Sequence, residues 1–196
     1  MNRPHAVVVA SKNPDKIAEI EAVLAALDPP IAVLDGHTWP DVEETEDTLE
    51  GNANLKADAV VAATGHAAVA DDTGLEVWAL DGAPGVIAAH YAGAEATYND
   101  NVDKLLRELD GVDDRRARFR TVVVLVTPGG ERLVVEGRLD GVITTARRGS
   151  GGFGYDPIFE VDGRTLAEIP TEEKNSMSHR ARALLALAEA LGLPDR

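Results

Sequence analysis

The pattern of hydrophobic and polar positions predicts a strand followed directly by a helix near the start of the chain. Residues 6–10 (AVVVA) form a continuous apolar run, which is typical of a strand buried on both faces. From Asn13 on, apolar residues recur at helical spacing: Ile17, Ile20, Val23, Leu24 and Leu27. Asn13 suits the N-cap of this helix and Pro14 its first position. The segment SKNPDK (residues 11–16) is therefore expected to be a strand-to-helix loop.

Strands and helices continue to alternate up to about residue 110. Residues 31–34 (IAVL) predict a second strand, and a helix is expected from about Thr48 to Ala63, with its stop at Gly65. The stretch AVADDTGLEV (residues 68–77) then places two adjacent aspartates between apolar segments. A turn-rich segment and a helix over residues 97–110 follow.

The second half of the chain is richer in strand patterns. Residues 116–128 and 131–139 predict an antiparallel hairpin around Pro-Gly-Gly. Residues 141–146 and 157–161 predict two more strands, and a final helix is expected from about Ser178. We therefore expect an α/β fold, a mixed sheet with flanking helices, in which two lobes of one domain over residues 1–196 surround a central substrate cleft.

Composition narrows the classes of function. The chain has 196 residues, no cysteine and a net charge of −15, so a Cys-ligated zinc site is excluded and a nucleic-acid polymer is not expected as a partner. No stretch approaches the roughly 20 apolar residues of a membrane span, and the first apolar segment is too short for a signal peptide. We expect a cytoplasmic location and no membrane partner.

The paired aspartates are the first candidates for chemistry. Side chains alternate along a strand, so Asp71 and Asp72 are expected to point in opposite directions, and Gly74 lets the chain turn close to a ligand. The functional hypothesis is a general base or a magnesium ligand at the end of a strand. The alternative is a turn capped by Asp and Thr.

A second carboxylate is available in the acidic run DVEETEDTLE (residues 41–50). Mg²⁺ is commonly held by one or two carboxylates together with substrate phosphates. Glu43 or Glu44 with Asp72 would form such a site, and spacing alone does not choose between them.

Three other segments carry possible ligand contacts. Ser11, Asn13 and Lys16 lie where a strand enters a helix, which favours a phosphate, although an ordinary helix cap is the alternative. GSGGFG (residues 149–154) matches G-x-G-x-x-G, but a strand follows it, so we reject a dinucleotide fingerprint. Aromatic residues at this loop suit stacking on a base, or else core packing; they are Phe153 and Tyr155. Donors that suit phosphate or a base edge precede or begin the last helix: Lys174, His179 and Arg180.

Taken in order, SKNPDK, EET, DDTGLEV, GAPG, GGFGYDPIF and EEKNSMSHR resemble the inosine triphosphate pyrophosphatase family, which removes nonstandard purine nucleotides such as dITP and XTP. The resemblance implies hydrolysis of dITP, ITP, XTP or dXTP to the monophosphate and pyrophosphate, with Mg²⁺ as cofactor. It also implies a homodimer. By the same resemblance Asp72 is the catalytic proton acceptor and a metal ligand, and Glu43 is the second metal ligand.

The resemblance assigns the remaining residues to the substrate. The segment from residue 11 to residue 16 is expected to hold the triphosphate, and Thr73 to contact substrate beside the base. The nucleobase pocket is expected to include residues 153–156, while Lys174 contacts substrate and the pair at 179 and 180 recognises the purine 6-oxygen. The substrate-binding set is Ser11, Lys12, Asn13, Pro14, Asp15, Lys16, Thr73, Phe153, Gly154, Tyr155, Asp156, Lys174, His179 and Arg180.

Two other functions are considered. A related pyrophosphatase that acts on pyrimidine or modified nucleotides would share the α/β cleft but not GGFGYDPIF followed by SHR. A nucleotide-binding regulator without catalysis would need no paired carboxylates, so Glu43 and Asp72 argue against it.

Overall fold

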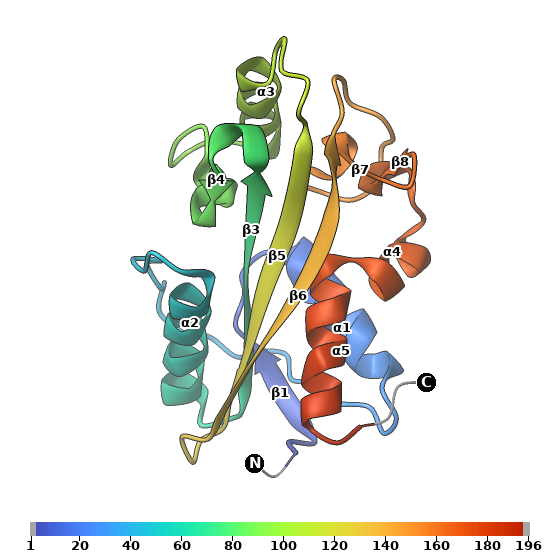
Figure 1. The fold of residues 1–196 in the computed structure, drawn as a ribbon. Helices are drawn as coiled ribbons and strands as arrows, with labels where there is room; N and C mark the ends of the chain where they lie inside the picture. Colours follow the sequence, from blue (N-terminus) through green and yellow to red (C-terminus); the bar gives the residue numbers. More distant parts are fainter. Residues whose placement is uncertain (1–2, 194–196) are drawn as a thin grey trace. The chain divides into compact units, whose positions relative to one another are not determined.

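The computed structural model describes residues 3–193, which form the α-helices and strands drawn in Figure 1. The helices are α1 (Pro14–Ala26), α2 (Leu49–Thr64), α3 (Tyr98–Glu108), α4 (Thr171–Met177) and α5 (His179–Ala190). The strands are β1 (Ala6–Val9), β2 (Ala32–Val33), β3 (Ala68–Val77), β4 (Pro84–Gly85), β5 (Arg116–Val126), β6 (Arg132–Ile143), β7 (Phe159–Val161) and β8 (Arg164–Thr165). No helix between residues 3 and 193 combines the length and the apolar composition that a membrane span requires.

The strands described between residues 3 and 193 form a mixed sheet of eight, in the order β2-β1-β3-β5-β6-β7-β8, with β4 paired to β3 off this path. β1 pairs in parallel with both β2 and β3, with Val8 opposite Ala68 in the second pair. The pairs β6–β7 and β7–β8 are antiparallel. The mixed α/β class expected from the sequence pattern is confirmed.

The described residues divide into two compact units. The first comprises residues 3–72, 121–137 and 178–193, and the second comprises residues 73–120 and 138–177. Three strands, β3, β5 and β6, contribute residues to both units.

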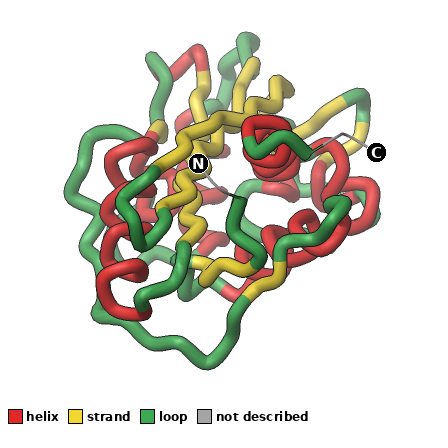
Figure 2. The backbone as a smooth tube through the Cα atoms, turned by 90° about the horizontal axis from the view of Figure 1, so that it is seen from below, coloured by secondary structure: helices red, strands yellow, loops and turns green. Residues whose placement is uncertain are grey.

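Helices lie on both sides of the strands in the first unit. Figures 1 and 2 show α2 on one side and α1 with α5 on the other. Alternate residues of the strands face α1 and α5, so Val7, Val9 and Val69 join a core cluster with Leu24 and Leu184. The strand residues between them face the other way, because side chains alternate along a strand.

The ends of the helices in the first unit follow the expected capping chemistry. The Asn13 side chain accepts hydrogen bonds from the backbone N–H groups of Asp15 and Lys16 at 2.9 and 3.4 Å. Thr48 caps α2 in the same way, and Gly65 ends that helix in the left-handed region at φ 69°. The boundaries expected for α1 and α2 are therefore confirmed to within a residue or two.

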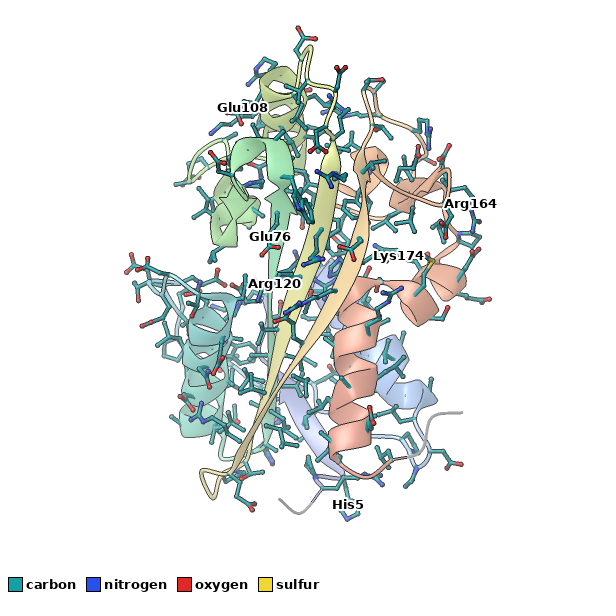
Figure 3. The ribbon with its side chains drawn as sticks, in the orientation of Figure 1. His5, Glu76, Glu108, Arg120, Arg164 and Lys174 are labelled. Atoms are coloured by element: carbon teal, nitrogen blue, oxygen red, sulfur yellow. The ribbon has the colours of Figure 1, made fainter. Side chains whose placement is uncertain are left out.

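The second unit has its own core, in which α3 packs with parts of β3, β5, β6 and β7; its largest fully buried members include Leu75, Leu105, Leu139, Ile158 and Phe159. The buried Asn101 of α3 donates to the Ala89 carbonyl at 2.9 Å and accepts from the Ala92 N–H at 2.7 Å. On neighbouring strands of this unit, Glu76 of β3 and Arg120 of β5 form an ion pair at 2.8 Å (Figure 3).

Two expectations about the strands are wrong. The chain does not turn at Gly74, because β3 runs without a break from Ala68 to Val77. Residues 141–143 are not a separate strand but the end of β6, where a Cβ at Gly141 would overlap the Glu160 carbonyl oxygen of the paired β7. The glycine there serves close strand approach instead of a turn. The segment before α5 forms a short helix, α4, which the sequence pattern did not indicate.

Gly137 tests how closely α5 packs on β6. A Cβ at this position would overlap the His179 carbonyl oxygen and the Ala183 nitrogen, both of which are backbone atoms that cannot rotate away. We therefore expect Gly137→Ala to lower the free energy of unfolding by about 1–3 kcal/mol or more, measured by chemical denaturation. Gly129→Ala is the matched control, since its Cβ would meet only the Thr127 hydroxyl at 3.7 Å. Equal stability of the two variants would contradict the close approach.

Candidate active site

Asp71 lies in a buried cluster of opposite charges on the α1 and α5 side of β3. Its side chain is 1% exposed, and its Oδ2 atom accepts from Arg180 Nε and Nη2, both at 3.1 Å. Lys16 Nζ from α1 lies 3.3 Å from the same oxygen, and Arg180 also pairs with the buried Glu19. Two cations and two carboxylates therefore neutralise one another inside the first unit.

Asp72 points in the opposite direction and meets α2. Lys56 Nζ lies 3.0 Å from Asp72 Oδ1 and 2.7 Å from Glu44 Oε1, so one ammonium is shared by two carboxylates. Asn52, one helical turn before Lys56, donates to Asp72 Oδ2 at 3.5 Å and accepts from the Glu46 N–H at 3.0 Å. The alternation expected for the two aspartates is confirmed: different helices meet them.

The two neighbouring carboxyl groups have opposite pKa shifts. Burial acts to raise the pKa of Asp71, but Lys16 and Arg180 outweigh it and hold this pKa below the usual aspartate range. Burial raises the pKa of Asp72 above its usual value; Lys56 opposes this shift and Glu44 adds to it. Burial likewise acts to lower the pKa of Lys56, yet Asp72, Asp71 and Glu44 keep it raised, so Lys56 is an ammonium. Asp72 is thus the more basic of the two carboxylates.

The loop before α1 and the first turn of that helix carry the residues expected at the triphosphate. The Ser11 hydroxyl accepts from the Asn13 N–H at 3.2 Å, and Asn13 caps α1. Lys16 reaches Asp71, whereas the exposed Lys12 pairs with the exposed Asp41. The other two members of this set, Pro14 and Asp15, are exposed in the first turn of the helix.

The start of α5 carries His179 and Arg180, both buried at 5% and 2% exposure. The Ser178 hydroxyl caps this helix by accepting from the Ala181 N–H at 3.1 Å. His179 Nδ1 lies 2.6 Å from the Thr121 hydroxyl of β5, a contact whose donor depends on the histidine tautomer. The roles expected for this pair at the purine 6-oxygen stay predictions.

The acidic loop before α2 places Glu43 and Glu44 differently. Glu43 is exposed, while Glu44 shares Lys56 with Asp72. Between residues 3 and 193, no group of three or more His, Cys, Asp or Glu side chains is arranged to hold a metal ion. Carboxylate oxygens that already converge on a cation are nevertheless the donor type that Mg²⁺ takes, and Mg²⁺ typically uses only one or two of them. The residues of this region therefore fit a magnesium ion that substrate phosphates help to hold.

A second group of expected residues comes together in the second unit. Lys174 of α4 (Figure 3) lies 2.6 Å from Asp156 Oδ2, and both side chains are almost fully buried. The same carboxylate accepts from the Phe153 N–H at 2.9 Å. The Lys174 ammonium also lies 5.0 Å from the centre of the Phe153 ring. This lysine therefore contacts both the aromatic ring and Asp156, the residue that holds the backbone N–H of Phe153.

Other residues expected around the nucleobase take different positions. Tyr155 is buried in the core of the second unit and its hydroxyl donates to the Ala88 carbonyl at 2.9 Å. This burial raises the pKa of Tyr155, and Tyr91 adds to the shift. Gly154 has a positive φ of 62°, and Thr73 is half-buried on β3. Tyr155 is thus a buried core residue, and its expected role at the nucleobase stays a prediction.

The sequence argument assigned no role to Lys56 or Asn52. A signal was present: two polar residues four positions apart in a helix otherwise rich in alanine lie on one helix face. Ala53, Ala57 and Val60 lie close to this face and are all buried. Polar side chains among them therefore require hydrogen-bond or charged partners. The partner of both proved to be Asp72.

Asp71 tests the buried charge cluster. Asp71→Asn leaves Arg180 and Lys16 short of one negative charge, so we expect the free energy of unfolding at neutral pH to fall by about 3–5 kcal/mol. The depressed pKa means that the contribution of Asp71 is fully present above about pH 4 and is lost as the pH falls through its lower folded-state value. The stability difference from wild type, measured by chemical denaturation, should therefore shrink in acid.

The control for this experiment is Asp35→Asn, which changes an exposed aspartate of the same unit. It should leave stability nearly unchanged at every pH. A destabilisation by Asp71→Asn that stays constant down to strongly acidic pH would contradict an ionised Asp71.

Comparison with known proteins gives a consistent result along the chain. The Ham1 family model matches residues 7–190. A dITP/XTP pyrophosphatase from Chlorobaculum tepidum is 48% identical, over 95% of this chain and 92% of the relative. One from Geobacter sulfurreducens is also 48% identical, over 95% of this chain and 96% of the relative.

A solved HAM1 protein from Coxiella burnetii has the same fold. It aligns with a TM-score of 0.83 at 39% identity, and covers 95% of this chain and 98% of its own. The resemblance that the motifs indicated is thereby confirmed. With the family model spanning both units and relatives of nearly half identity over almost the whole length, the chain belongs to the Ham1 family.

Proposed function

We propose that this protein hydrolyses nonstandard purine nucleoside triphosphates, namely dITP, ITP, XTP and dXTP, to the monophosphate and pyrophosphate, and so cleanses the nucleotide pool. The observation that carries the proposal is Asp72, a buried carboxylate of raised pKa next to a lysine ammonium. The names of relatives that are 48% identical supply the substrate class.

Asp72 is proposed as the general base. A carboxylate accepts a proton from water more readily when its pKa is raised toward the working pH, and burial has this effect on Asp72. Lys56 and Asn52 hold the two oxygens of the carboxylate, which fixes its orientation. Asp72 is thus both basic and oriented, as a group that activates water must be.

Mg²⁺ is proposed as the cofactor, with Asp72 and Glu43 as its protein ligands. When bound, the ion would neutralise phosphate charge and polarise the phosphoryl group. Glu43, exposed on its loop, is the proposed second ligand, and Glu44, which already approaches the same lysine as Asp72, is the alternative. Removing each glutamate separately distinguishes them.

Binding of a triphosphate to a protein of net charge −15 requires local positive charge. We propose that the segment Ser11–Lys16 holds the triphosphate through Lys16, the Ser11 hydroxyl and backbone N–H groups, and that Lys174 contacts the substrate. Phosphoryl transfer depends mainly on positioning and on neutralising charge, which these groups supply. Lys12, exposed and paired with Asp41, is included in this segment without a separate role.

For the base, we propose that Phe153 stacks on the purine, that residues 154–156 complete the pocket and that His179 and Arg180 recognise the 6-oxygen. Thr73 would contact substrate beside the base. Stacking tolerates any base, so discrimination depends on the hydrogen bonds to the 6-oxygen. The homodimer and the cytoplasmic location expected from the sequence also stay predictions.

A nucleotide panel tests the function. We expect release of pyrophosphate and the monophosphate from ITP, dITP and XTP, little release from ATP, and no activity after exhaustive chelation of divalent metal. Orthophosphate as the product would indicate an ordinary triphosphatase, and a preference for pyrimidine nucleotides would indicate the related pyrophosphatase. Turnover no higher than in buffer alone would favour a nucleotide-binding regulator.

Asp72 and Asp71 form a matched pair of variants. Asp72→Asn should lower kcat by roughly 10²-fold or more, because general-base catalysis typically contributes 10² to 10⁴. It should stay folded, as judged by circular dichroism, since Lys56 keeps Glu44 as a carboxylate partner. Asp71→Asn should instead mainly lose stability. Near-normal turnover in folded Asp72→Asn protein would sink the assignment of the base.

A further inference from the structure

The glycine-rich loop does little by itself to fix the position of its aromatic residue. In residues 149–154 (GSGGFG) four of six residues are glycine, and Gly149, Gly152 and Gly154 all have positive φ. Glycine has the largest choice of backbone conformations, so a loop of this composition loses much entropy when it becomes ordered. Backbone hydrogen bonds hold the loop at Gly151, whose N–H donates to the Ala167 carbonyl at 3.0 Å, and at Phe153, whose carbonyl accepts from the Asp156 N–H at 3.2 Å. The orientation of the Phe153 ring depends in addition on the side chains that contact it.

Three side chains of the second unit contact Phe153. Its N–H donates to Asp156 at 2.9 Å, and Lys174 lies 5.0 Å from the centre of its ring. The third contact is Tyr98, whose ring centre lies 5.9 Å from that of Phe153 with the planes inclined at 39°. Aromatic pairs at this separation attract each other beyond the area they bury. Tyr98 is otherwise an exposed residue, with 42% of its surface accessible.

Tyr98 is a firm point of attachment because its helix is well anchored. It is the first residue of α3, directly after the N-cap Thr97, which forms a reciprocal capping box with Asp100. One turn further on, the buried Asn101 ties α3 to the backbone of Ala89 and Ala92. A ring on this helix end can therefore restrain the glycine-rich loop.

A second link joins the same end of α3 to the segment that leads into the loop. Arg147 donates from Nη1 to Asp103 Oδ1 at 2.9 Å and from Nη2 to the Asn99 carbonyl at 3.2 Å. The first two turns of α3 thus contact this segment at two places, through Arg147 before the glycines and through Phe153 among them.

We infer that Tyr98 is a positioning residue for nucleobase binding: its ring holds Phe153 in place before the nucleotide arrives. This rests on the proposed function, in which Phe153 stacks on the purine. Holding the aromatic platform in advance lowers the entropy lost on binding, so the effect falls on affinity for the base and not on the chemical step. The hydroxyl of Tyr98 is not needed for this role.

The test compares binding of two probes to the full-length protein by calorimetry. Inosine monophosphate carries the base and cannot release pyrophosphate, while inorganic tripolyphosphate, used with a chelator, carries only phosphates. We expect Tyr98→Ala to weaken binding of inosine monophosphate by about 2- to 10-fold and to leave binding of tripolyphosphate unchanged. Tyr98→Phe, which keeps the ring, should bind both probes as wild type does. Arg107→Ala, at the exposed far end of α3, is the control for changes to the helix surface.

Unchanged binding of inosine monophosphate by Tyr98→Ala would overturn the inference. So would an equal loss of both probes, which would indicate a general disturbance of the fold, or a loss in Tyr98→Phe as large as in Tyr98→Ala. Turnover of ITP by wild type is measured separately. If the variants show the expected binding pattern but the wild-type protein releases no pyrophosphate from ITP, the proposed function is refuted and the role of Tyr98 in binding the base stands.

Discussion

The burial of two adjacent carboxylates in the middle of β3 is the constraint on which the first unit depends. A buried charge is costly unless a partner of opposite charge meets it. Because Asp71 and Asp72 are neighbours in a strand, they face opposite sides, so their cations must come from different helices. Lys16 and Arg180 meet the first, and Lys56 meets the second. The positions of α1 and α5 on one side and α2 on the other are therefore linked to charge as well as to apolar packing.

The same constraint separates stability from chemistry in two residues of one type. Asp71 lies against two cations and has a lowered pKa, so it remains ionised, and its ion pairs contribute to the stability of the fold. Asp72 shares a single lysine with Glu44, and burial leaves its pKa raised. A carboxylate whose charge is less fully compensated is the better proton acceptor and the better place for a metal ion. Environment, not residue type, distinguishes the stabilising Asp71 from Asp72, the proposed general base.

Local rules predicted much of this fold, and they failed where distant residues decided. Asn13 and Gly65 could be identified as helix ends because capping depends on a few neighbouring atoms. Gly74 and Gly141 were misread as breaks, since only tertiary partners show that a glycine sits inside a continuous strand. Lys56 was overlooked for the same reason: its partner lies 16 residues away on another element.

The two groups of site residues differ in how their positions are held, and this affects what a sequence can reveal. Asp72 lies within β3, and two adjacent aspartates in an apolar strand are visible in the sequence itself. Phe153 lies among glycines, and its ring contacts residues from other elements, among them Tyr98 at the start of α3. Composition alone indicated an aromatic residue on a glycine-rich loop that suits stacking on a base, but not which residues restrain it. Under the proposed function, support from a neighbouring helix would hold the Phe153 ring in place before a base binds, so that little entropy is lost on binding.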